Sequence, residues 1–263
     1  MRPIWEGALS FGLILIPVKL YKATEERKPN FHFVGKDDLC PVKYVKVCKF
    51  TGEEIPADKI ARSYEYRKGE QILFDDEDFK KVYKKRSENI EIIEFTGLNE
   101  IDVKFYEQPY YLEPSKGASK VYTLLREALK RTGKVGVARY VLHNLEHLGV
   151  LTFDEDILIL NQIRFNTEFR KPENMQIPLP GNMNEKEIDT AIMLIDQLTM
   201  PFKPEDFSDT YSEEIKKAIE EKVKTGKFSG ETSEPDQKPG KVLDLMEKLK
   251  LSLEEAKKKK NVS

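Results

Sequence analysis

The first apolar stretch of the chain, residues 4–21, alternates between apolar and polar positions and then loses that alternation. One parity is apolar and the other is polar or small: Trp5, Leu9 and Phe11 against Glu6, Ala8 and Ser10. A period of two is typical of a strand with one buried face. Between residues 13 and 16 both parities are apolar, which predicts cover on both faces until Pro17 interrupts the ladder. We expect one strand that founds a sheet or a barrel.

Further segments with the character of strands follow along the chain. They are residues 62–67, 70–74, 90–114 and 135–165. The first two flank Lys68 and Gly69, a pair that favours a hairpin turn. Gly97 divides the third segment into two predicted strands, and an acidic turn at residues 154–156 divides the fourth.

Three segments are predicted to be helices, each followed by a residue that ends a helix. They are residues 121–129 before Gly133, 188–198 before Pro201 and 212–225 before Gly226. Residues 227–240 have the Gly, Ser and Pro content of a linker. Beyond them an amphipathic stripe from Val242 to Leu253 predicts a short helix, which we expect to become ordered on a partner.

Charge is abundant but nearly balanced over the 263 residues. Charged residues make up 34% of the chain, hydrophobic residues make up 39%, and the net charge is −2. Such a balance does not indicate a nucleic-acid binder unless the charges are segregated. They are segregated, because residues 1–50 hold 9 Lys and Arg against 5 Asp and Glu, whereas residues 151–200 hold 4 against 9. The modest apolar share predicts extended, solvated elements beside a core.

Two segments concentrate lysine and arginine. Within residues 40–50 a strand-like pattern has cations on both faces: Lys43, Lys46 and Lys49. This pattern suits a ribbon that stands away from the core and contacts a polyanion, and a solvated edge strand protected by lysines fits it equally well. Residues 80–86 form a second basic cluster after a short predicted helix that Asp75 to Asp78 would cap. A helix end exposed to water is the alternative reading of that cluster.

The cysteine content and the N-terminal residues indicate in which cellular compartment the protein is expected. Cys40 and Cys48 are the only cysteines, nothing else suggests secretion, and a reducing cytosol is expected. The apolar N-terminal run contains Glu6, follows only Arg2 and lacks a small-residue cleavage site, which argues against a signal peptide. It is also shorter than the roughly 20 apolar residues that span a bilayer. We therefore expect a soluble, cytoplasmic protein.

Two patterns resemble metal sites. His143, Glu146 and His147 match the H-x-x-E-H pattern of one class of zinc hydrolase, which needs both histidines on one face of a helix. The flanking residues alternate like strands, on which the two histidines would lie roughly 13 Å apart.

Cys48 begins a second such pattern, but Thr51 stands where a zinc knuckle needs its other thiolate. Cys40 and His32 could supply part of a ligand set. Buried or idle cysteines are favoured over a zinc site, and strands are favoured over the helix that the hydrolase pattern needs. The sequence contains no other recognisable cofactor motif or catalytic centre.

Five blocks of the sequence are similar to one known family. They are IWEGALSFGLILIPVKLYKATE, KYVKVC, SYEYRKGE, YYLEPSKGASKVYTLLREAL and VLDLMEKLKLSLEEAKKKK. Together they resemble prokaryotic Ku, the DNA-end-binding protein of non-homologous end joining. The resemblance implies a mixed β and α fold, with an antiparallel β-barrel core, an inserted β-strand bridge and a C-terminal α-helical dimerisation arm.

The resemblance also implies a division of the chain and a function. Residues 1–183 would be the barrel core with a DNA-encircling bridge at about 30–95. Residues 184–226 would be the helical arm, and residues 227–263 a flexible linker, a ligase-recruiting helix and a short basic tail. Two subunits would form a non-enzymatic homodimeric ring that binds double-stranded DNA ends independently of sequence. The ring would recruit and stimulate the ATP-dependent repair DNA ligase, without a cofactor or metal, in a cytoplasm where it associates with the nucleoid.

Candidate residues follow for each role. Those for DNA, chosen on charge and strand position, are Lys43, Lys46, Lys49, Arg62, Lys68, Lys84, Lys85, Arg86, Lys116 and Arg139. Those for dimerisation are Ile188, Ile192, Ile195 and Leu198. Those for the ligase are Val242, Leu245, Met246, Leu249 and Leu253. Two alternative functions stand beside this one: a zinc hydrolase that uses the H-x-x-E-H segment, and a scaffold that binds RNA or a partner protein.

Overall fold

The computed structural model divides the chain into two units. One comprises residues 1–26 and 32–171, and the other comprises residues 27–31 and 172–263. The residues that the structure describes are 1–25, 29–75, 77–79, 89–173, 175–178, 181, 184–226 and 249–254. None of the helices within these ranges is long and apolar enough to cross a membrane.

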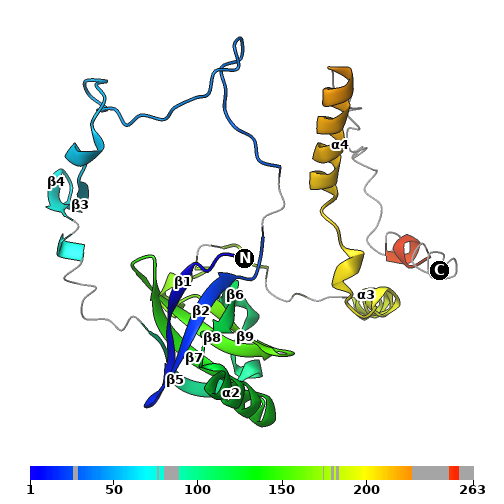
Figure 1. The fold of residues 1–263 in the computed structure, drawn as a ribbon. Helices are drawn as coiled ribbons and strands as arrows, with labels where there is room; N and C mark the ends of the chain where they lie inside the picture. The colour runs from blue at the N-terminus through cyan, green and yellow to red at the C-terminus, as the bar shows by residue number, and fades with distance from the viewer. Residues whose placement is uncertain are drawn as a thin grey trace. The chain divides into compact units, whose positions relative to one another are not determined.

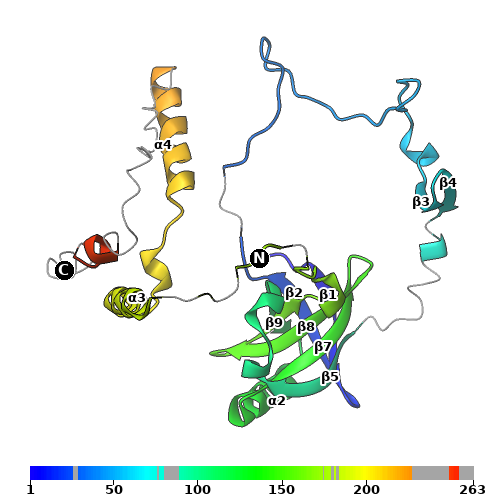
Figure 2. The same ribbon diagram turned by 180° about the vertical axis from the view of Figure 1, so that it is seen from behind.

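Seven strands of the first unit form a closed barrel in the order β1-β2-β6-β9-β8-β7-β5. Their bounds are Trp5–Phe11 (β1), Ile14–Lys22 (β2), Ile90–Gly97 (β5), Tyr106–Pro114 (β6), Lys134–Leu142 (β7), Leu145–Asp154 (β8) and Ile157–Ile163 (β9). Figures 1 and 2 show the barrel from opposite sides. The predicted barrel is confirmed, and its pairings are antiparallel except for β1–β5, which is parallel and closes the sheet.

The N-terminal stretch forms two strands, so the prediction of one continuous strand was wrong. β1 ends at Phe11, and β2 begins at Ile14 after a turn in which Gly12 adopts a φ of 57°. Glycine enters this left-handed region without the steric penalty of a side chain. The turn pairs Leu9 with Ile16 and brings residues of both parities into one core. The apolar run at residues 13–16 therefore marks a hairpin and the start of a second strand.

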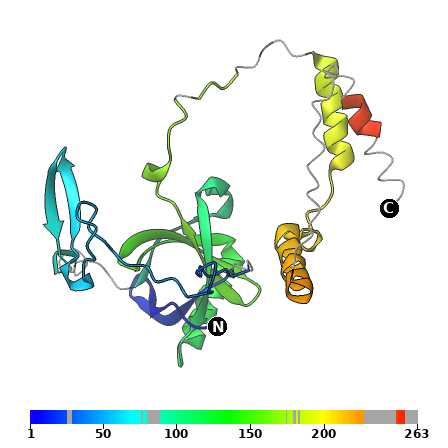
Figure 3. The same cartoon turned by 90° about the horizontal axis from the view of Figure 1, so that it is seen from above.

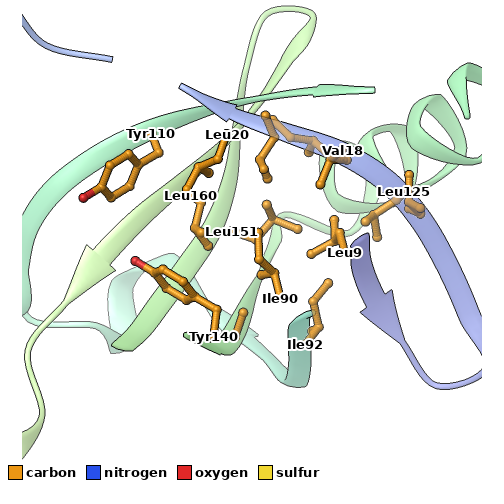
Figure 4. Close-up of a cluster of buried hydrophobic side chains, with 14 of the residues drawn as sticks. Leu9, Val18, Leu20, Ile90, Ile92, Tyr110, Leu125, Tyr140, Leu151 and Leu160 are labelled. Atoms are coloured by element: carbon orange, nitrogen blue, oxygen red, sulfur yellow. The ribbon is translucent and has the colours of Figure 1, made fainter. Parts of the chain in front are cut away.

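The core fills the barrel with side chains from all its strands (Figure 4). Its largest fully buried side chains include Leu9, Leu20, Leu112 and Leu160. At one end of the cluster Tyr110 and Tyr140 point their hydroxyls the same way, and both donate to Gln162 Oε1, at 3.4 and 3.3 Å. A glutamine oxygen thus satisfies two hydroxyls that would otherwise be desolvated without a partner.

Helix α2, Ser119–Thr132, confirms the clearest predicted helix. Its buried residues Leu125 and Leu129 pack on the barrel core, and Gly133 ends it with a φ of 62°. The hydroxyl of Tyr122 donates to the Leu112 carbonyl at 2.7 Å and accepts from the Leu158 N–H at 2.7 Å. This hydroxyl stands at the end of the β6–β9 ladder, where Leu112 pairs with Leu158. The helix therefore locks two strands that lie more than 40 residues apart in the sequence.

A long insertion separates β2 from β5, and residues 29–75 of it are called the insertion below. Strands β3 (Arg62–Arg67) and β4 (Glu70–Phe74) form a two-stranded sheet with the predicted bounds (Figure 3). The strand expected within residues 40–50 is absent from the described insertion, where isolated bridges join Val34 to Pro41 and Val47 to Glu54. Alternating lysines and apolar residues have no partner strand there to complete a ladder. Because β5 begins at Ile90 and belongs to the barrel, the inserted part ends before the expected limit of about 95.

The second unit contains two of the predicted helices, α3 (Glu185–Leu198) and α4 (Thr210–Thr225). The side chain of Asn184 accepts a hydrogen bond from the Lys186 N–H and caps α3. Gly226 ends α4 with a φ of 72°. Residues 249–254 are also helical. Short 3₁₀ turns occur at Ala57–Lys59, Leu98–Glu100, Val103–Phe105, Asn166–Glu168 and Pro204–Asp206.

Candidate nucleic-acid interface

The insertion has no core of its own. None of the described residues 29–75 is buried, and every side chain of β3 is exposed. Apolar and aromatic groups are exposed with the polar ones, as Tyr44 (79%), Tyr64 (63%) and Leu73 (73%) illustrate. A lone two-stranded sheet is at best marginally stable in water. Burial within residues 29–75 therefore contributes little to their folding, and their side chains are open to a molecule outside the barrel.

Three of the predicted DNA residues lie together in sequence on this insertion. Lys43, Lys46 and Lys49 are all exposed, and no Asp or Glu occurs between residues 39 and 52. The chain folds back from Cys48 to Glu53, with Lys49 in the turn, because the Cys48 N–H donates to the Glu53 carbonyl and the Gly52 N–H to the Cys48 carbonyl, both at 2.8 Å. The lysine run therefore presents positive charge without an acidic neighbour in the sequence.

The β3–β4 hairpin carries two more of the predicted cations. The Arg62 guanidinium lies 5.0 Å from the centre of the Phe79 ring, a geometry that holds the cation in place by cation–π attraction. Lys68 lies in the turn, which is fixed by a 2.7 Å hydrogen bond from the Gly69 N–H to Glu65 Oε1. Both side chains are exposed and available to phosphates.

The remaining predicted DNA residues do not belong to the insertion. Lys116 is exposed in the loop before α2, and Arg139 lies on the outside of β7, 3.8 Å from Glu146 Oε1. That ion pair reduces the positive charge that Arg139 can offer to DNA. The other three lie outside the described residues: Lys84, Lys85 and Arg86.

Sequence reasoning missed several groups on the insertion that can bind nucleic acid. Exposed tyrosines stand among the cations, and Tyr44 and Tyr64 can donate to phosphate or stack on an unpaired base. Further exposed cations are Lys36, Lys59 and Arg67. The interleaving of aromatic and basic residues over 43–68 was the signal that could have identified all of them except Lys36.

The H-x-x-E-H segment is a hairpin and not a helix. His143 and Asn144 form the turn between β7 and β8, with φ values of 51° and 66°. His147 stacks against Tyr140, with ring centres 5.4 Å apart, and Glu146 faces Arg139. This geometry does not provide the shared helix face that a zinc hydrolase of this class needs.

Cysteines also form no metal cluster in the part of the chain that the structure describes. No group of three or more His, Cys, Asp or Glu there could hold a metal ion. The Cys48 sulfur instead faces Thr51 and Phe50, and hydrogen bonds from the Thr51 side chain and the two backbone N–H groups hold the thiol pKa below its ordinary value. Thr51, which replaces the second cysteine of the knuckle pattern, thus supplies a hydrogen bond to the Cys48 sulfur.

Comparison with known proteins identifies the family. A model described as the Ku70/Ku80 beta-barrel domain matches residues 10–191, which is more than half of the chain. The chain belongs to the Ku family. The matched range includes every strand of the Ku barrel except the first part of β1, and it also includes the insertion.

Relatives of similar length match nearly the whole chain. "Non-homologous end joining protein Ku" of Bacillus subtilis is 36% identical over 97% of this chain and 82% of its own length. The proteins of the same name from Opitutus terrae and Coxiella burnetii are 35% and 34% identical. These matches cover 96% and 98% of this chain, and 91% and 96% of the two relatives. The family similarity therefore extends to both units.

Proposed function

We propose that this chain binds the ends of double-stranded DNA, independently of sequence, in the repair of double-strand breaks by non-homologous end joining. Membership of the Ku family and the names of the relatives support this role. The observation that carries it on this chain is the exposed run of Lys43, Lys46 and Lys49 without an acidic neighbour between residues 39 and 52. Lysines bind the phosphate backbone whatever the base sequence, which suits a protein that must accept any break.

The proposed form of the protein is a non-enzymatic homodimeric ring. The apolar stripe on α3 supports a dimer, because Ile192 and Ile195 are 50% and 64% exposed in a single chain. Ile188 and Leu198 extend the same stripe at helical spacing. A second copy could bury an apolar stripe of this kind in a closed, two-fold assembly.

The C-terminal region is proposed to recruit and stimulate the ATP-dependent DNA ligase. Leu249 and Leu253 are half-buried in the helical residues 249–254. The other three residues of the predicted ligase contact lie outside the described residues: Val242, Leu245 and Met246. A short amphipathic segment after a linker is suited to fold on a partner.

A competition experiment tests the DNA-end proposal. A labelled linear duplex is bound to the full chain and displaced with unlabelled linear or covalently closed circular DNA of equal length and sequence. Because a ring loads from an end, the linear competitor should be effective and the circular one weak. Equal competition by the two would rule out an end-loading ring.

The dimer is tested separately by light scattering on the full chain. Introducing Ile192→Asp together with Ile195→Asp should convert the dimer to a monomer, because two carboxylates would be desolvated in the interface. Lys186→Asp, on the opposite side of α3, is the matched control and should leave the mass unchanged. A doubly substituted protein that keeps the dimer mass would exclude α3 as the interface.

Removal of residues 227–263 tests the ligase role. The shortened protein should stay a dimer and keep its DNA binding but stimulate the ligase less than the full chain does. Unchanged stimulation would place the ligase contact elsewhere, and a loss of dimerisation would contradict the assignment of the dimer to α3.

A further inference from the structure

A cavity on the outside of the barrel, called the Tyr21 cavity below, has a volume of about 780 Å³. It is lined by the outer faces of β2 and β6, by one side of α2 and by the turn between β8 and β9. A volume of this size accommodates a small ligand or a few residues of an extended peptide. We infer that the Tyr21 cavity binds a lysine- or arginine-bearing peptide of a partner protein.

The floor of the cavity is aromatic and acidic. Tyr21 pairs with Tyr111 across β2 and β6, and the inward neighbours Leu20 and Leu112 are fully buried. Side chains alternate along a strand, so the two tyrosines lie on the outside. The Tyr21 hydroxyl donates to Glu113 Oε2 at 2.6 Å. This hydrogen bond orients the carboxylate beside an aromatic ring, a combination that attracts cations.

The wall of the cavity is fixed by Arg126 of α2. Its Nη1 donates to the Asp156 carbonyl at 2.8 Å and lies 2.9 Å from the Asp156 carboxylate. Its Nη2 lies 3.1 Å from Glu127 Oε1. The guanidinium therefore holds the β8–β9 turn against the helix. Because its charge is already matched by these two acids, it contributes little positive potential to the cavity.

The net negative charge of the lining favours a cationic ligand. Four carboxylates line the cavity, those of Glu113, Asp154, Glu155 and Asp156. Arg126 is the cationic side chain of this lining, so the side chains that line the cavity carry an excess of three negative charges. Among the described residues neither Asp154 nor Glu155 has a salt-bridge partner. Such a lining repels phosphate, so the cavity is not part of the DNA interface.

Apolar groups in the lining favour a peptide side chain over a bare cation. Pro114 and Ile157 contribute to the lining beside the tyrosines. The aliphatic stems of lysine and arginine pack on such groups while the charged ends reach carboxylates. Because the described residues contain no cluster of three or more acids arranged for a metal, a divalent ion does not account for the site.

Anisotropy of a fluorescein-labelled hexalysine peptide, titrated with the full chain at about 0.1 M salt, tests the inference. Thr123→Trp fills the cavity from the α2 wall without a change of charge, and we expect it to weaken binding by about tenfold or more. Leu124→Trp is the matched control, because this neighbour is 62% exposed and does not line the cavity. Binding that survives Thr123→Trp, in a protein that melts like the parent, would overturn the inference.

Charge variants provide a second, independent measurement. Asp154→Asn combined with Glu155→Gln should weaken peptide binding about fivefold, because two carboxylates that attract it are removed. Glu53→Gln combined with Glu54→Gln removes the same charge from the exposed insertion and should change nothing. Equal losses in the two proteins would mean non-specific attraction and would overturn the inference.

Other occupants give different results. A chain that ends at residue 254 lacks Lys257 to Lys260 and should bind the peptide as the full chain does. Tighter binding by this shorter chain would mean that the protein's own tail competes for the cavity. If Thr123→Trp changed the oligomeric state, the cavity would be a contact between two copies of the chain. If spermidine bound more strongly than the peptide, the cavity would be a polyamine site. Each of these results overturns the inference. Binding to linear DNA is expected to be unchanged by every cavity variant, so the proposed function is tested separately.

Discussion

The barrel and the insertion contain similar apolar residues but differ in how far they bury them. Barrel strands bury leucines completely, as Leu112 and Leu160 illustrate, whereas the hairpin of the insertion leaves Tyr64 and Leu73 mostly exposed. The two hairpin strands form with the bounds that their alternation predicts. In this hairpin alternation predicts where the strands lie, but it does not reveal whether a core of the same chain covers them.

The helices repeat this difference. Helix α2 buries Tyr122, Leu125 and Leu129, whereas α3 has an apolar stripe of the same period whose Ile192 and Ile195 are half exposed or more. Burial inside the chain contributes to its stability, whereas an exposed apolar stripe is suited to a contact with another molecule. The predictions below test this division between self-supporting and partner-dependent parts.

The largest expected effect is a loss of stability in the barrel. Leu112→Ala should lower the free energy of unfolding by about 2–5 kcal/mol, because it leaves a cavity at a fully buried site. Leu73→Ala, in the exposed hairpin, should cost less than about 0.5 kcal/mol. Urea denaturation followed by the fluorescence of Trp5, which packs against the core, measures both. Comparable losses in the two proteins would show that the hairpin has a core within this chain.

The second largest expected effect is a loss of DNA affinity when lysines of the insertion are replaced, without a change in the stability of the barrel. Exchange of Lys43, Lys46 and Lys49 for glutamine should weaken binding to linear duplex DNA by roughly tenfold or more and reduce the salt dependence by about one unit of slope per lysine. Denaturation should be unchanged, because all three side chains are exposed.

The matched control for the lysine variant lies on α4. Exchange of its exposed residues Lys216, Lys217 and Lys222 for glutamine removes the same charge from the second unit. Equal losses of affinity in the two triple variants would mean that net charge, and not the insertion, governs binding.

A third effect appears at alkaline pH. Burial, followed by the effects of Tyr110 and Glu107, raises the pKa of Tyr140 well above its ordinary value of 10.0. The folded state thus holds this proton more tightly than the unfolded state does. The resulting stability is fully present below pH 10 and is lost as pH rises above it, by up to about 1.4 kcal/mol per pH unit.

Tyr140→Phe should make that alkaline slope shallower. At neutral pH it should cost about 1 kcal/mol, because the hydrogen bond to Gln162 is lost. Tyr64→Phe, on the exposed hairpin, should leave the profile as it is. Denaturation of the three proteins between pH 8 and 11 measures the slopes, and parallel curves for the parent and Tyr140→Phe would contradict the role assigned to burial.

The smallest effect compares two helix ends of the same geometry. Gly133→Ala, after α2, should lower stability by about 1 kcal/mol, because its φ of 62° strains a residue with a side chain. Gly226→Ala, at a φ of 72° after α4, should leave the barrel transition unchanged because α4 belongs to the other unit. Thermal unfolding measures both, and a shift of the barrel transition by Gly226→Ala would show that the two units unfold together.

Much of the local structure was predictable. The helix that ends at Gly133 and the hairpin around Lys68 and Gly69 have the expected places, because period and turn chemistry act within a few residues. The strand expected at residues 40–50 does not form, since a ladder needs a partner strand that the pattern does not reveal. For the candidate interface, Lys43, Lys46 and Lys49 are exposed and their contact with DNA stays a prediction, whereas the pairing of Arg139 with Glu146 could not be foreseen.

By itself the sequence determined the kinds of elements, the helix ends and the family resemblance, because these depend on residues that are neighbours in the chain. Only the tertiary structure decided the turn at Gly12, the parallel closure of β1 on β5 and the cavity in which Arg126 holds Asp156. The closure and the cavity depend on the register between segments that are distant in sequence, whereas the turn at Gly12 joins adjacent strands whose two faces are sorted by packing on the core. Register is set by the packing of both sides together. The sequence pattern therefore indicates which secondary-structure element each segment forms. Tertiary packing decides which apolar side chains are buried within the chain and which stay exposed.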